Sequence, residues 1–409
     1  MLMLWHTHSN SLPIFAPMKK IWLNKGKDQS ALRRHPWIYS GAVKKVEEGI
    51  QEGDAVEVYS AQNQLIGVGH YQPANIAVRL LAFEPAALDE AFWQLRLQQA
   101  WALRQQLGLI DNKETTAYRL VFAEGDQLPG LILDVYGSTA VLQAHSLGMW
   151  RVRQQLAQAV VAVAGGRITA VYDKSAETLH AAAGAIQNSY LIGEGSEQEV
   201  VVMENGVRFK IDWIGGQKTG FFLDQRENRA LLAQHARGKR VLNTFCYTGG
   251  FSVYALQAGA TEVHSVDVSA KAVALTDENV ALNGGQERHQ SFAMDTFAYL
   301  KEKGGDYDIV ILDPPAFAKS MGKRHNALMG YKRLNYEAIR QLQPGGLLYT
   351  FSCSGVVDKQ LFQNIVMSAA IEAGRPVRVL HQLSQPADHP YSLYHPEGEY
   401  LKGLVLQVM

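Results

Sequence analysis

Two side chains suited to covalent and acid–base chemistry each follow an apolar run in the C-terminal half of the chain. One run ends at Asp313, in the sequence DPPAF, and the other ends at Cys353, in TFSCSG. Apolar runs bounded by turn residues predict buried strands. Ligands of an open α/β sheet bind outside the carboxyl ends of its strands, so we expect the thiol and the carboxylate to share one crevice. That crevice is the candidate active site.

A third apolar run, from Arg240 to Phe245, leads into a turn of small residues and then a helix rich in Ala and Leu. Such a turn lets the backbone approach a ligand closely. The next predicted strand ends at Asp267, 17 positions after Gly250, and a carboxylate there can accept both hydroxyls of a ribose. A dinucleotide-binding fold has the same pattern, but the strict GxGxxG spacing is absent, which disfavours a nicotinamide cofactor.

The elements that must position these residues alternate regularly from Glu204 onward. Strands are predicted at 240–245, 262–267, 307–313 and 346–351, with helices between them, which indicates a doubly wound, largely parallel sheet. Upstream, short strands between Val56 and Phe83 suit a small β-barrel, and 118–202 mixes strands with a helix at 150–163. We therefore predict a multidomain chain with an N-terminal extension (1–17), a β-barrel module (18–90), a middle α+β domain (91–203) and a C-terminal α/β domain (204–409).

With these motifs in this order, the chain resembles the class I S-adenosylmethionine (SAM)-dependent RNA methyltransferases of the RlmI type, which make 5-methylcytosine in large-subunit (23S) ribosomal RNA. The resemblance runs from Met18 to the last residue. Besides the three strand ends it rests on RRHPWIYSG at 33–41, LPGL at 128–131 with Asp134, QKTGFFLDQR at 217–226, ADHP at 387–390 and PEGEYLKG at 396–403. It implies an N-terminal PUA domain and a Rossmann-like catalytic domain at the C-terminus.

Methylation of cytosine at carbon 5 would give Cys353 a specific task. Carbon 5 is too weak a nucleophile until a thiolate adds to carbon 6, after which the methyl group is transferred, a base removes the proton and the thiolate leaves. Asp313 would hydrogen-bond the amino edge or a protonated ring nitrogen of the cytosine. Taken alone, a free cysteine is most often a small buried hydrophobe, and Asp before Pro is common in turns. We interpret Cys246 as a packing residue.

The resemblance also implies a SAM site, formed by the turn after the first strand of the C-terminal domain, two later acidic residues and the loop before that strand. Its expected residues are Phe245, Tyr247, Thr248, Gly249, Asp267, Asp295, Asp224, Gln225 and Arg226. Asp267 would bind the ribose, and Asp295 would accept the adenine amino group unless it is an ordinary loop residue. The histidines are scattered without a ligand spacing, so no metal is predicted.

Basic and aromatic residues alternate near the N-terminus. Between Lys19 and Lys45 there are eight Lys or Arg against one acid, Asp28, interleaved with Trp22, Trp37 and Tyr39. Such residues can pair with phosphates and stack on unpaired bases; a solvated face over core tryptophans is the alternative. With the resemblance, the expected RNA contacts are Arg33, Arg34, Trp37, Lys218, Pro314, Phe317 and Lys319. A flipped base is expected, because carbon 6 is inaccessible inside a stacked helix.

Composition agrees with a cytoplasmic enzyme. Of the 409 residues 47% are hydrophobic, Lys and Arg balance Asp and Glu at 39 each, and there are two cysteines. The equal numbers of acidic and basic residues argue against a positive electrostatic field over the whole molecule that would bind any polyanion. Two cysteines cannot form a disulfide framework. No apolar run approaches the roughly 20 residues that span a bilayer. Residues 1–17 do not look like a signal peptide, and translation from Met18 stays open.

Three matters stay open at this level. A SAM-dependent enzyme that methylates a base nitrogen would keep the DPPxF strand end and would not need Cys353. An RNA-binding assembly factor could keep the fold without turnover. A homodimer is also compatible with the sequence.

Overall fold

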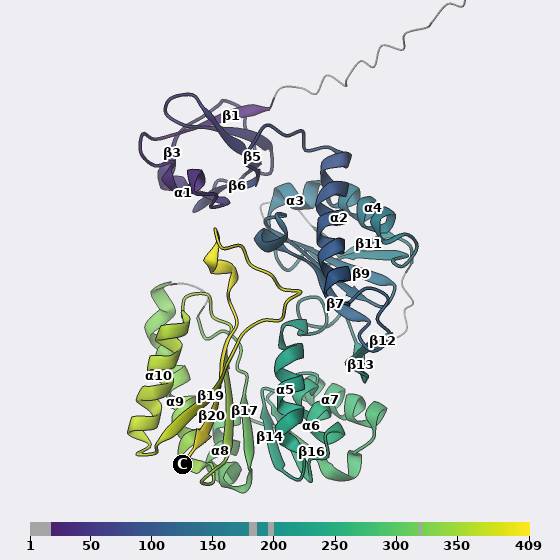
Figure 1. The fold of residues 1–409 in the computed structure, drawn as a ribbon, viewed down its shortest axis with the longest axis vertical. Coiled ribbons are helices and arrows are strands. Elements are labelled where there is room, and N and C mark those ends of the chain that lie inside the picture. The colour runs from purple at the N-terminus through teal and green to yellow at the C-terminus, as the bar shows by residue number, and fades with distance from the viewer. Residues whose placement is uncertain (1–17, 180–185, 195–199, 319–320) are drawn as a thin grey trace, which may run out of the picture. The chain divides into compact units, whose positions relative to one another are not determined.

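The computed structural model describes residues 18–179, 186–194, 200–318 and 321–409. The chain divides into two units, one ending at Ala87 and the other running from Leu88 to Met409 (Figure 1). Among the described residues, no helix combines the length and the apolar content that crossing a bilayer requires.

The first unit is a six-stranded, mostly antiparallel sheet with one short helix, α1 (Gln29–Leu32). Its order is β2-β6-β5-β4-β1-β3, with only β1 and β4 parallel. Gly69 allows β5 to approach β6, because a Cβ there would lie 2.1 Å from the Arg79 carbonyl oxygen. The strands are β1 (Lys19–Leu23), β2 (Trp37–Tyr39), β3 (Val43–Val46), β4 (Ala55–Tyr59), β5 (Leu65–Tyr71) and β6 (Ile76–Ala82).

The second unit begins with α2 (Glu90–Gln106), whose N-cap Asp89 accepts a hydrogen bond from the Phe92 amide at 2.9 Å. A five-stranded sheet follows, in the order β11-β10-β9-β8-β7. It contains β7 (Ala117–Phe122), β8 (Leu131–Tyr136), β9 (Thr139–Ala144), β10 (Ala170–Asp173) and β11 (Ser189–Ile192), with α3 (Leu147–Arg151) and α4 (Arg153–Ala164) between β9 and β10. The single helix expected at 150–163 is thus two consecutive helices. A two-stranded sheet, β12 (Val200–Glu204) and β13 (Val207–Ile211), leads onward.

The rest of the second unit is built on a seven-stranded sheet in the order β16-β15-β14-β17-β18-β20-β19. The first five strands are parallel and β20 is antiparallel to both its neighbours. This confirms the predicted doubly wound, largely parallel sheet. The strands are β14 (Arg240–Thr244), β15 (Glu262–Asp267), β16 (His289–Ala293), β17 (Ile309–Leu312), β18 (Leu347–Ser352), β19 (Val377–Leu383) and β20 (Lys402–Val408).

Successive residues of the central strands enter two different apolar cores, because side chains alternate across a sheet. On β14, Val241 belongs to one core and Leu242 to the other. On β17, Ile309 and Ile311 belong to the first core, whereas Val310 and Leu312 belong to the second. Helices therefore cover both faces of this sheet. They are α5 (Arg226–Ala236), α6 (Gly250–Gln257), α7 (Ala270–Asn283), α8 (Thr296–Lys303), α9 (Arg324–Gln341) and α10 (Lys359–Glu372).

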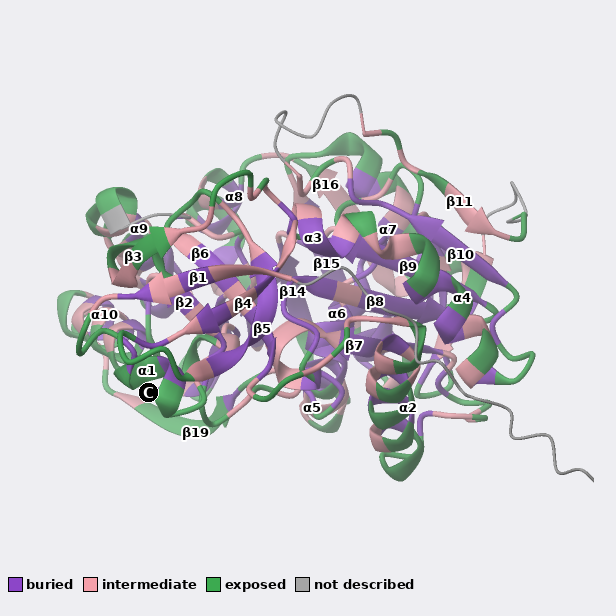
Figure 2. Ribbon diagram, turned by 90° about the horizontal axis from the view of Figure 1, so that it is seen from above, coloured by how far each residue is buried: buried purple, intermediate pink, exposed green. Residues whose placement is uncertain are grey.

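The sequence prediction did not include β16, β19 and β20. Strand β19 has mostly exposed side chains (Figure 2), as expected for the edge of a sheet. Strand β20 is buried along most of its length, between β18 and β19. Strand β20 therefore lies beside β18, the strand that Cys353 directly follows.

Candidate active site

The carboxyl ends of β14, β15, β17 and β18 line one pocket of about 540 Å³ in the second unit. The chain passes from β16 back to β17, on the other side of β14, so the pocket lies where the strand order reverses. The pocket brings together ten of the residues expected in the site. These are Lys218, Asp224, Gln225, Phe245, Tyr247, Thr248, Asp267, Asp313, Pro314 and Cys353.

The turn after β14 has an unusual backbone. Phe245 and Tyr247 have φ of 54° and 46°, which non-glycine residues rarely adopt, and Gly249 has φ of 75°. A Cβ at Gly249 would lie 2.5 Å from Cγ2 of Thr276, so only glycine fits there. Helix α7 holds the turn, because Thr276 donates to the Tyr247 carbonyl at 2.9 Å and Asn279 to the Thr248 carbonyl at 2.9 Å. The backbone is thus fixed against the pocket before any ligand arrives.

Asp267 ends β15 with its carboxylate oriented by two backbone amides. Oδ2 accepts from Tyr247 N at 3.1 Å and Oδ1 accepts from Ser269 N at 2.9 Å. A carboxylate has about four acceptor positions, so two remain for a ligand. The side chain is half-buried and lines the pocket. An oriented carboxylate beside a glycine turn fits a ribose with two adjacent hydroxyls.

We expect Asp267→Ala to weaken S-adenosylhomocysteine binding by about ten- to a hundredfold, because two hydrogen bonds to a charged acceptor would be lost. Isothermal titration calorimetry measures this directly. Glu278→Ala is the matched control, since that acid lies on α7 and pairs with Lys210 on the surface at 2.5 Å. An equal loss of binding in both variants would contradict the role of Asp267.

Asp313 follows β17 and accepts a hydrogen bond from Gln225 Nε2 at 2.9 Å. Burial, together with the nearby Asp224 carboxylate, raises the pKa of Asp313 to about 7. The Gln225 hydrogen bond and the Arg229 and Lys218 charges only partly oppose this. Near neutral pH the Asp313 side chain can therefore exist as a carboxylic acid that donates a hydrogen bond as well as a carboxylate that accepts one.

This shift makes a prediction about stability. The folded-state pKa of Asp313 lies above its unfolded value near 4, so its contribution to stability decreases as the pH rises from about 4 to about 7. Between pH 4 and pH 8, the free energy of unfolding of Asp313→Asn should therefore increase by about 1–3 kcal/mol relative to that of the wild type. Urea unfolding at both pH values measures this. A difference that is independent of pH would contradict the raised pKa.

Asp224 is buried and receives a short hydrogen bond from the Tyr400 hydroxyl. Burial opposes ionisation of this carboxyl, but the Lys218 and His389 charges, with that hydrogen bond, hold its pKa below the usual range. The pocket thus contains one carboxyl that favours the charged form, Asp224, and one that resists it, Asp313. Such a division is typical of sites that need both states at one pH.

Cys353 lies directly after β18 and is half-buried at the pocket wall. Burial, followed by the Asp313 charge, raises the pKa of its thiol to about 11, whereas Lys218 and Lys402 act in the opposite direction. The next residue, Ser354, donates from Oγ to the Ala318 carbonyl at 2.7 Å. This bond joins the cysteine loop to the segment that follows DPPAF.

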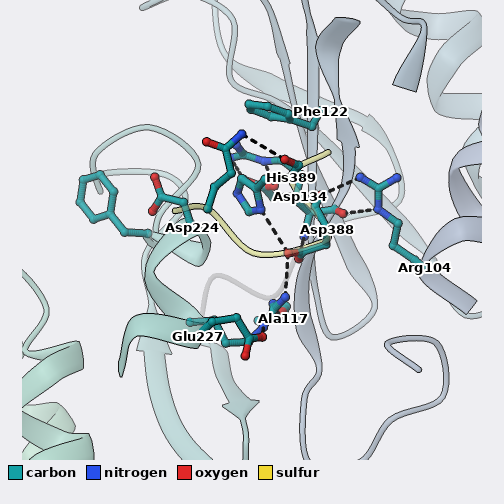
Figure 3. A network of polar contacts seen from close by, with 12 residues as sticks. Arg104, Ala117, Phe122, Asp134, Asp224, Glu227, Asp388 and His389 are labelled. Atoms are coloured by element: carbon teal, nitrogen blue, oxygen red, sulfur yellow. Dashed lines mark hydrogen bonds and ion pairs between the residues drawn. The ribbon is translucent and has the colours of Figure 1, made fainter. Parts of the chain in front are cut away.

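Arg226 does not line the pocket. Its guanidinium binds Asp388 Oδ1 at 2.7 Å, and both side chains are almost fully buried. Asp388 also accepts from the Arg119 amide at 3.0 Å, and its backbone carbonyl accepts from Arg104 at 2.7 Å (Figure 3). A cofactor contact by Arg226 stays a prediction, while the observed contacts join α5 to the middle sheet and to the C-terminal loop.

Three other expected residues also lie outside the pocket lining. Gly249 shapes the turn without lining the pocket. Asp295 is exposed and caps α8, accepting from the Ala298 amide at 3.0 Å. Phe317 packs on Tyr331 with ring centroids 4.6 Å apart. Lys319 lies outside the described residues. Cys246 is buried, 3.5 Å from the Thr276 hydroxyl, in agreement with packing, although it also borders the pocket.

In the first unit, Arg33 and Arg34 are exposed and Trp37 is half-buried. Arg34 lies over the Phe83 ring, with its guanidinium carbon 5.3 Å from the centroid. Lys45 lies over Trp22 at 5.2 Å, and Trp22 donates to Asn63 at 3.0 Å. These charges and rings are therefore at least partly exposed and do not form a closed core.

Two residues of the site were missed by the sequence reasoning. Tyr400 reaches Asp224, and Lys402 is buried beside the cysteine loop, where it donates to the Ser354 carbonyl at 2.7 Å. Both belong to the motif PEGEYLKG, but no individual role was predicted for either. A lysine at the start of an apolar strand was the signal available.

Known proteins resemble the chain along nearly its whole length. A model of the S-adenosylmethionine-dependent methyltransferase family matches residues 139–394, and a model of the PUA-like domain matches residues 21–83. A protein from Tolumonas auensis named ribosomal RNA large subunit methyltransferase I is 41% identical over 397 residues, covering 95% of this chain and 99% of the relative. The chain belongs to the family of ribosomal RNA large subunit methyltransferase I. A relative of the same name from Aeromonas hydrophila is also 41% identical, over 395 residues, covering 95% of this chain and 98% of its own.

Solved structures agree with the fold of this family. A candidate SAM-dependent methyltransferase from Streptococcus mutans has a TM-score of 0.83 at 24% identity, covering 96% of this chain and all of its own. A second structure with the same values was solved in complex with SAH. The protein is a SAM-dependent methyltransferase with an N-terminal PUA-like domain, as expected. The glycine turn and the Asp267 carboxylate, with two free acceptor positions, fit this cofactor.

Proposed function

We propose that the protein methylates carbon 5 of a cytosine in large-subunit ribosomal RNA and that Cys353 is the nucleophile. The observation that carries the proposal is one pocket that contains a thiol, an oriented carboxylate at the glycine turn and a carboxyl with a pKa of about 7. The names of the relatives from Tolumonas auensis and Aeromonas hydrophila support the substrate class.

The thiol is the feature that favours carbon 5 over a nitrogen atom. A base nitrogen with a lone pair can attack a methyl donor directly, whereas carbon 5 requires prior addition of a nucleophile to carbon 6. SAM, when bound, would supply the methyl group to carbon 5 of the adduct and be released as S-adenosylhomocysteine (SAH). The thiolate of Cys353 adds to carbon 6, and after a base has removed the proton at carbon 5, the electrons of the carbon–sulfur bond return to the thiolate.

Asp313 is proposed to hold the cytosine ring. With a pKa of about 7, it can donate a hydrogen bond to ring nitrogen 3 when protonated, which favours electron flow into the ring as sulfur adds. Gln225 orients it by binding Oδ2. Because Asp313 follows β17 and Cys353 follows the neighbouring β18, both groups approach the same base.

RNA contacts would come from both units. We propose that Arg33, Arg34 and Trp37 bind RNA through charge and stacking, and that Lys218 and Lys319 bind RNA phosphates. Phe317 would stack on the flipped base, and Pro314 would stiffen the loop beside it. We propose that Gly249, Arg226 and Asp295 support the cofactor site indirectly or after a local rearrangement. A homodimer and a cytoplasmic location also stay predictions.

The product identifies the reaction. Purified protein is incubated with unmodified large-subunit ribosomal RNA and SAM labelled in the methyl group, and the digested nucleosides are separated and identified. Labelled 5-methylcytidine would support the proposal, and small-subunit RNA is the control. A methyl group on a base nitrogen would favour the alternative enzyme, and SAH binding without transfer to any RNA or assembled subunit would favour an assembly factor.

A further inference from the structure

Lys402 is a buried charge that the proposed reaction has not used. It begins β20, directly opposite Ser352 on β18 in the antiparallel register. The whole residue is only 3% exposed to solvent. A buried ammonium is costly unless it is bonded and paired. Lys402 Nζ donates to the Ser354 carbonyl at 2.7 Å and to the Tyr400 carbonyl at 2.5 Å. Two of its three donors are thus used by backbone carbonyls.

The partners of these two bonds are informative. Ser354 follows Cys353 in the chain, and Tyr400 is the residue whose hydroxyl binds Asp224. The Lys402 ammonium therefore connects the loop after Cys353 to Tyr400, whose hydroxyl binds the pocket residue Asp224. Since Ser354 also donates to the Ala318 carbonyl at 2.7 Å, the loop after Cys353 is held from both sides.

The charge on Lys402 has no bonded carboxylate within the described residues. Burial lowers its pKa to about 8, and the largest opposing effect comes from Cys353, ahead of Asp358 and Glu399. Glu399 is itself paired with the exposed Lys359. Cys353 is thus the acidic group whose ionised form the buried ammonium would stabilise most strongly.

We propose that Lys402 is a positioning residue that fixes the loop carrying Cys353 through the Ser354 carbonyl and adds a buried positive charge, beside the exposed Lys218, that favours the Cys353 thiolate. This rests on the proposed role of Cys353. The other charged or titratable groups that act on the thiol are Asp313 after β17, Asp224 before α5, Lys218 in the preceding loop, and Tyr331 and Tyr400 from α9 and the C-terminal segment. Lys218 is exposed, so Lys402 is the buried cation among them.

The test measures the thiol directly and needs neither RNA nor cofactor. The full-length protein is treated with iodoacetamide between pH 6.5 and 9.5, and the alkylation rates of Cys353 and Cys246 are obtained by peptide mass spectrometry. Only the thiolate reacts, so the Cys353 rate reports its thiolate fraction. Lys402→Gln keeps a hydrogen-bond donor and removes the charge, and Lys402→Arg keeps the charge. Lys359→Gln removes an exposed lysine near the same segment and is the matched control.

At pH 7 the Cys353 rate should fall about three- to tenfold in Lys402→Gln, with little change in the other two variants. The deficit should shrink above pH 8, where wild-type Lys402 loses its own charge. A loss of packing alone would instead speed alkylation of both cysteines. An unchanged Cys353 rate at pH 7, or a deficit that persists unchanged to pH 9.5, would overturn the proposal.

Wild-type protein provides a second measurement if Lys402→Gln does not fold. A plot of the logarithm of the Cys353 rate against pH should bend near pH 8 as Lys402 titrates, and a straight line would overturn the proposal. The outcome is separate from the proposed function. If 5-methylcytidine formation does not depend on Cys353, the nucleophile assignment fails even where Lys402 controls the thiol.

Discussion

Replacement of Cys353 by alanine should reduce methyl transfer to RNA by about a thousandfold or more, while SAH binding stays within about twofold of wild type. The reason is that carbon 5 of cytosine has no comparable route to methylation without addition at carbon 6. The thiol lies at the pocket wall, whereas Asp267 and the turn after β14 lie at other strand ends. Initial rates of labelled methyl incorporation, with calorimetry of SAH binding, measure both quantities.

A covalent trap makes this test sharper. In RNA with 5-fluorocytidine, fluorine replaces the proton that must leave, so the wild-type protein should stay attached to the RNA under denaturing conditions. Cys353→Ala should form no such adduct. Cys246→Ser is the matched control and should still form it, because burial raises the pKa of the Cys246 thiol to about 12 and its sulfur packs near Thr276. Full transfer by Cys353→Ala would instead favour methylation of a base nitrogen.

Replacement of Asp388 by alanine should cost about 3–5 kcal/mol of the free energy of unfolding. Its carboxylate is fully buried and binds Arg226 at 2.7 Å and the Arg119 amide at 3.0 Å. It also binds His389 at 3.1 Å (Figure 3). Alanine would leave the Arg226 guanidinium buried without this partner. Urea unfolding followed by circular dichroism measures the change.

Glu227→Ala is the control, because it removes an exposed carboxylate that also pairs with Arg226. That contact is 3.4 Å long and the Glu227 side chain is 62% exposed, so the expected cost is within about 0.5 kcal/mol. Burial opposes ionisation of the Asp388 carboxyl, but its partners His389 and Arg226 hold its pKa well below the usual range. Its contribution is therefore present above pH 4 and lost as the pH falls further. Equal costs in the two variants would contradict this account.

The central part of the catalytic sheet was predictable because its strands carry a local signal. The run at 240–245 leads into a turn of small residues and the run at 307–313 ends in Asp313. The alternation of helices and strands implies that those ends meet on one edge. Strand β19 lacked this signal, since Arg378, His381 and Gln382 interrupt it, as an exposed edge permits. Strand β20 was missed because a regular alternation does not imply an antiparallel insertion.

From the strand pattern alone, the site was predictable only where residues end a strand or follow it directly, whereas Lys218, Asp224 and Gln225 were expected from the family resemblance. Cys353, Asp313 and Asp267 met this condition and line one pocket. Arg226 did not, because its partner Asp388 lies 162 positions away and no periodicity links them. Tyr400 and Lys402 lie in a motif that the sequence singled out, but their contacts with Asp224 and the Ser354 carbonyl were not predictable for the same reason. Their contacts depend on how the C-terminal loop crosses from the middle sheet to β20, and that path is set by tertiary packing.

The position of β20 in the sheet affects how the enzyme can be made. This strand follows every other strand of the sheet in the chain, yet it lies between β18 and β19 and carries Lys402 at its start. Among the strands that the structure describes, β19 pairs only with β20, so during synthesis it has no partner in this sheet until β20 has left the ribosome. A protein that modifies ribosomal RNA thus completes its cysteine pocket only after every other strand of this sheet has been synthesised.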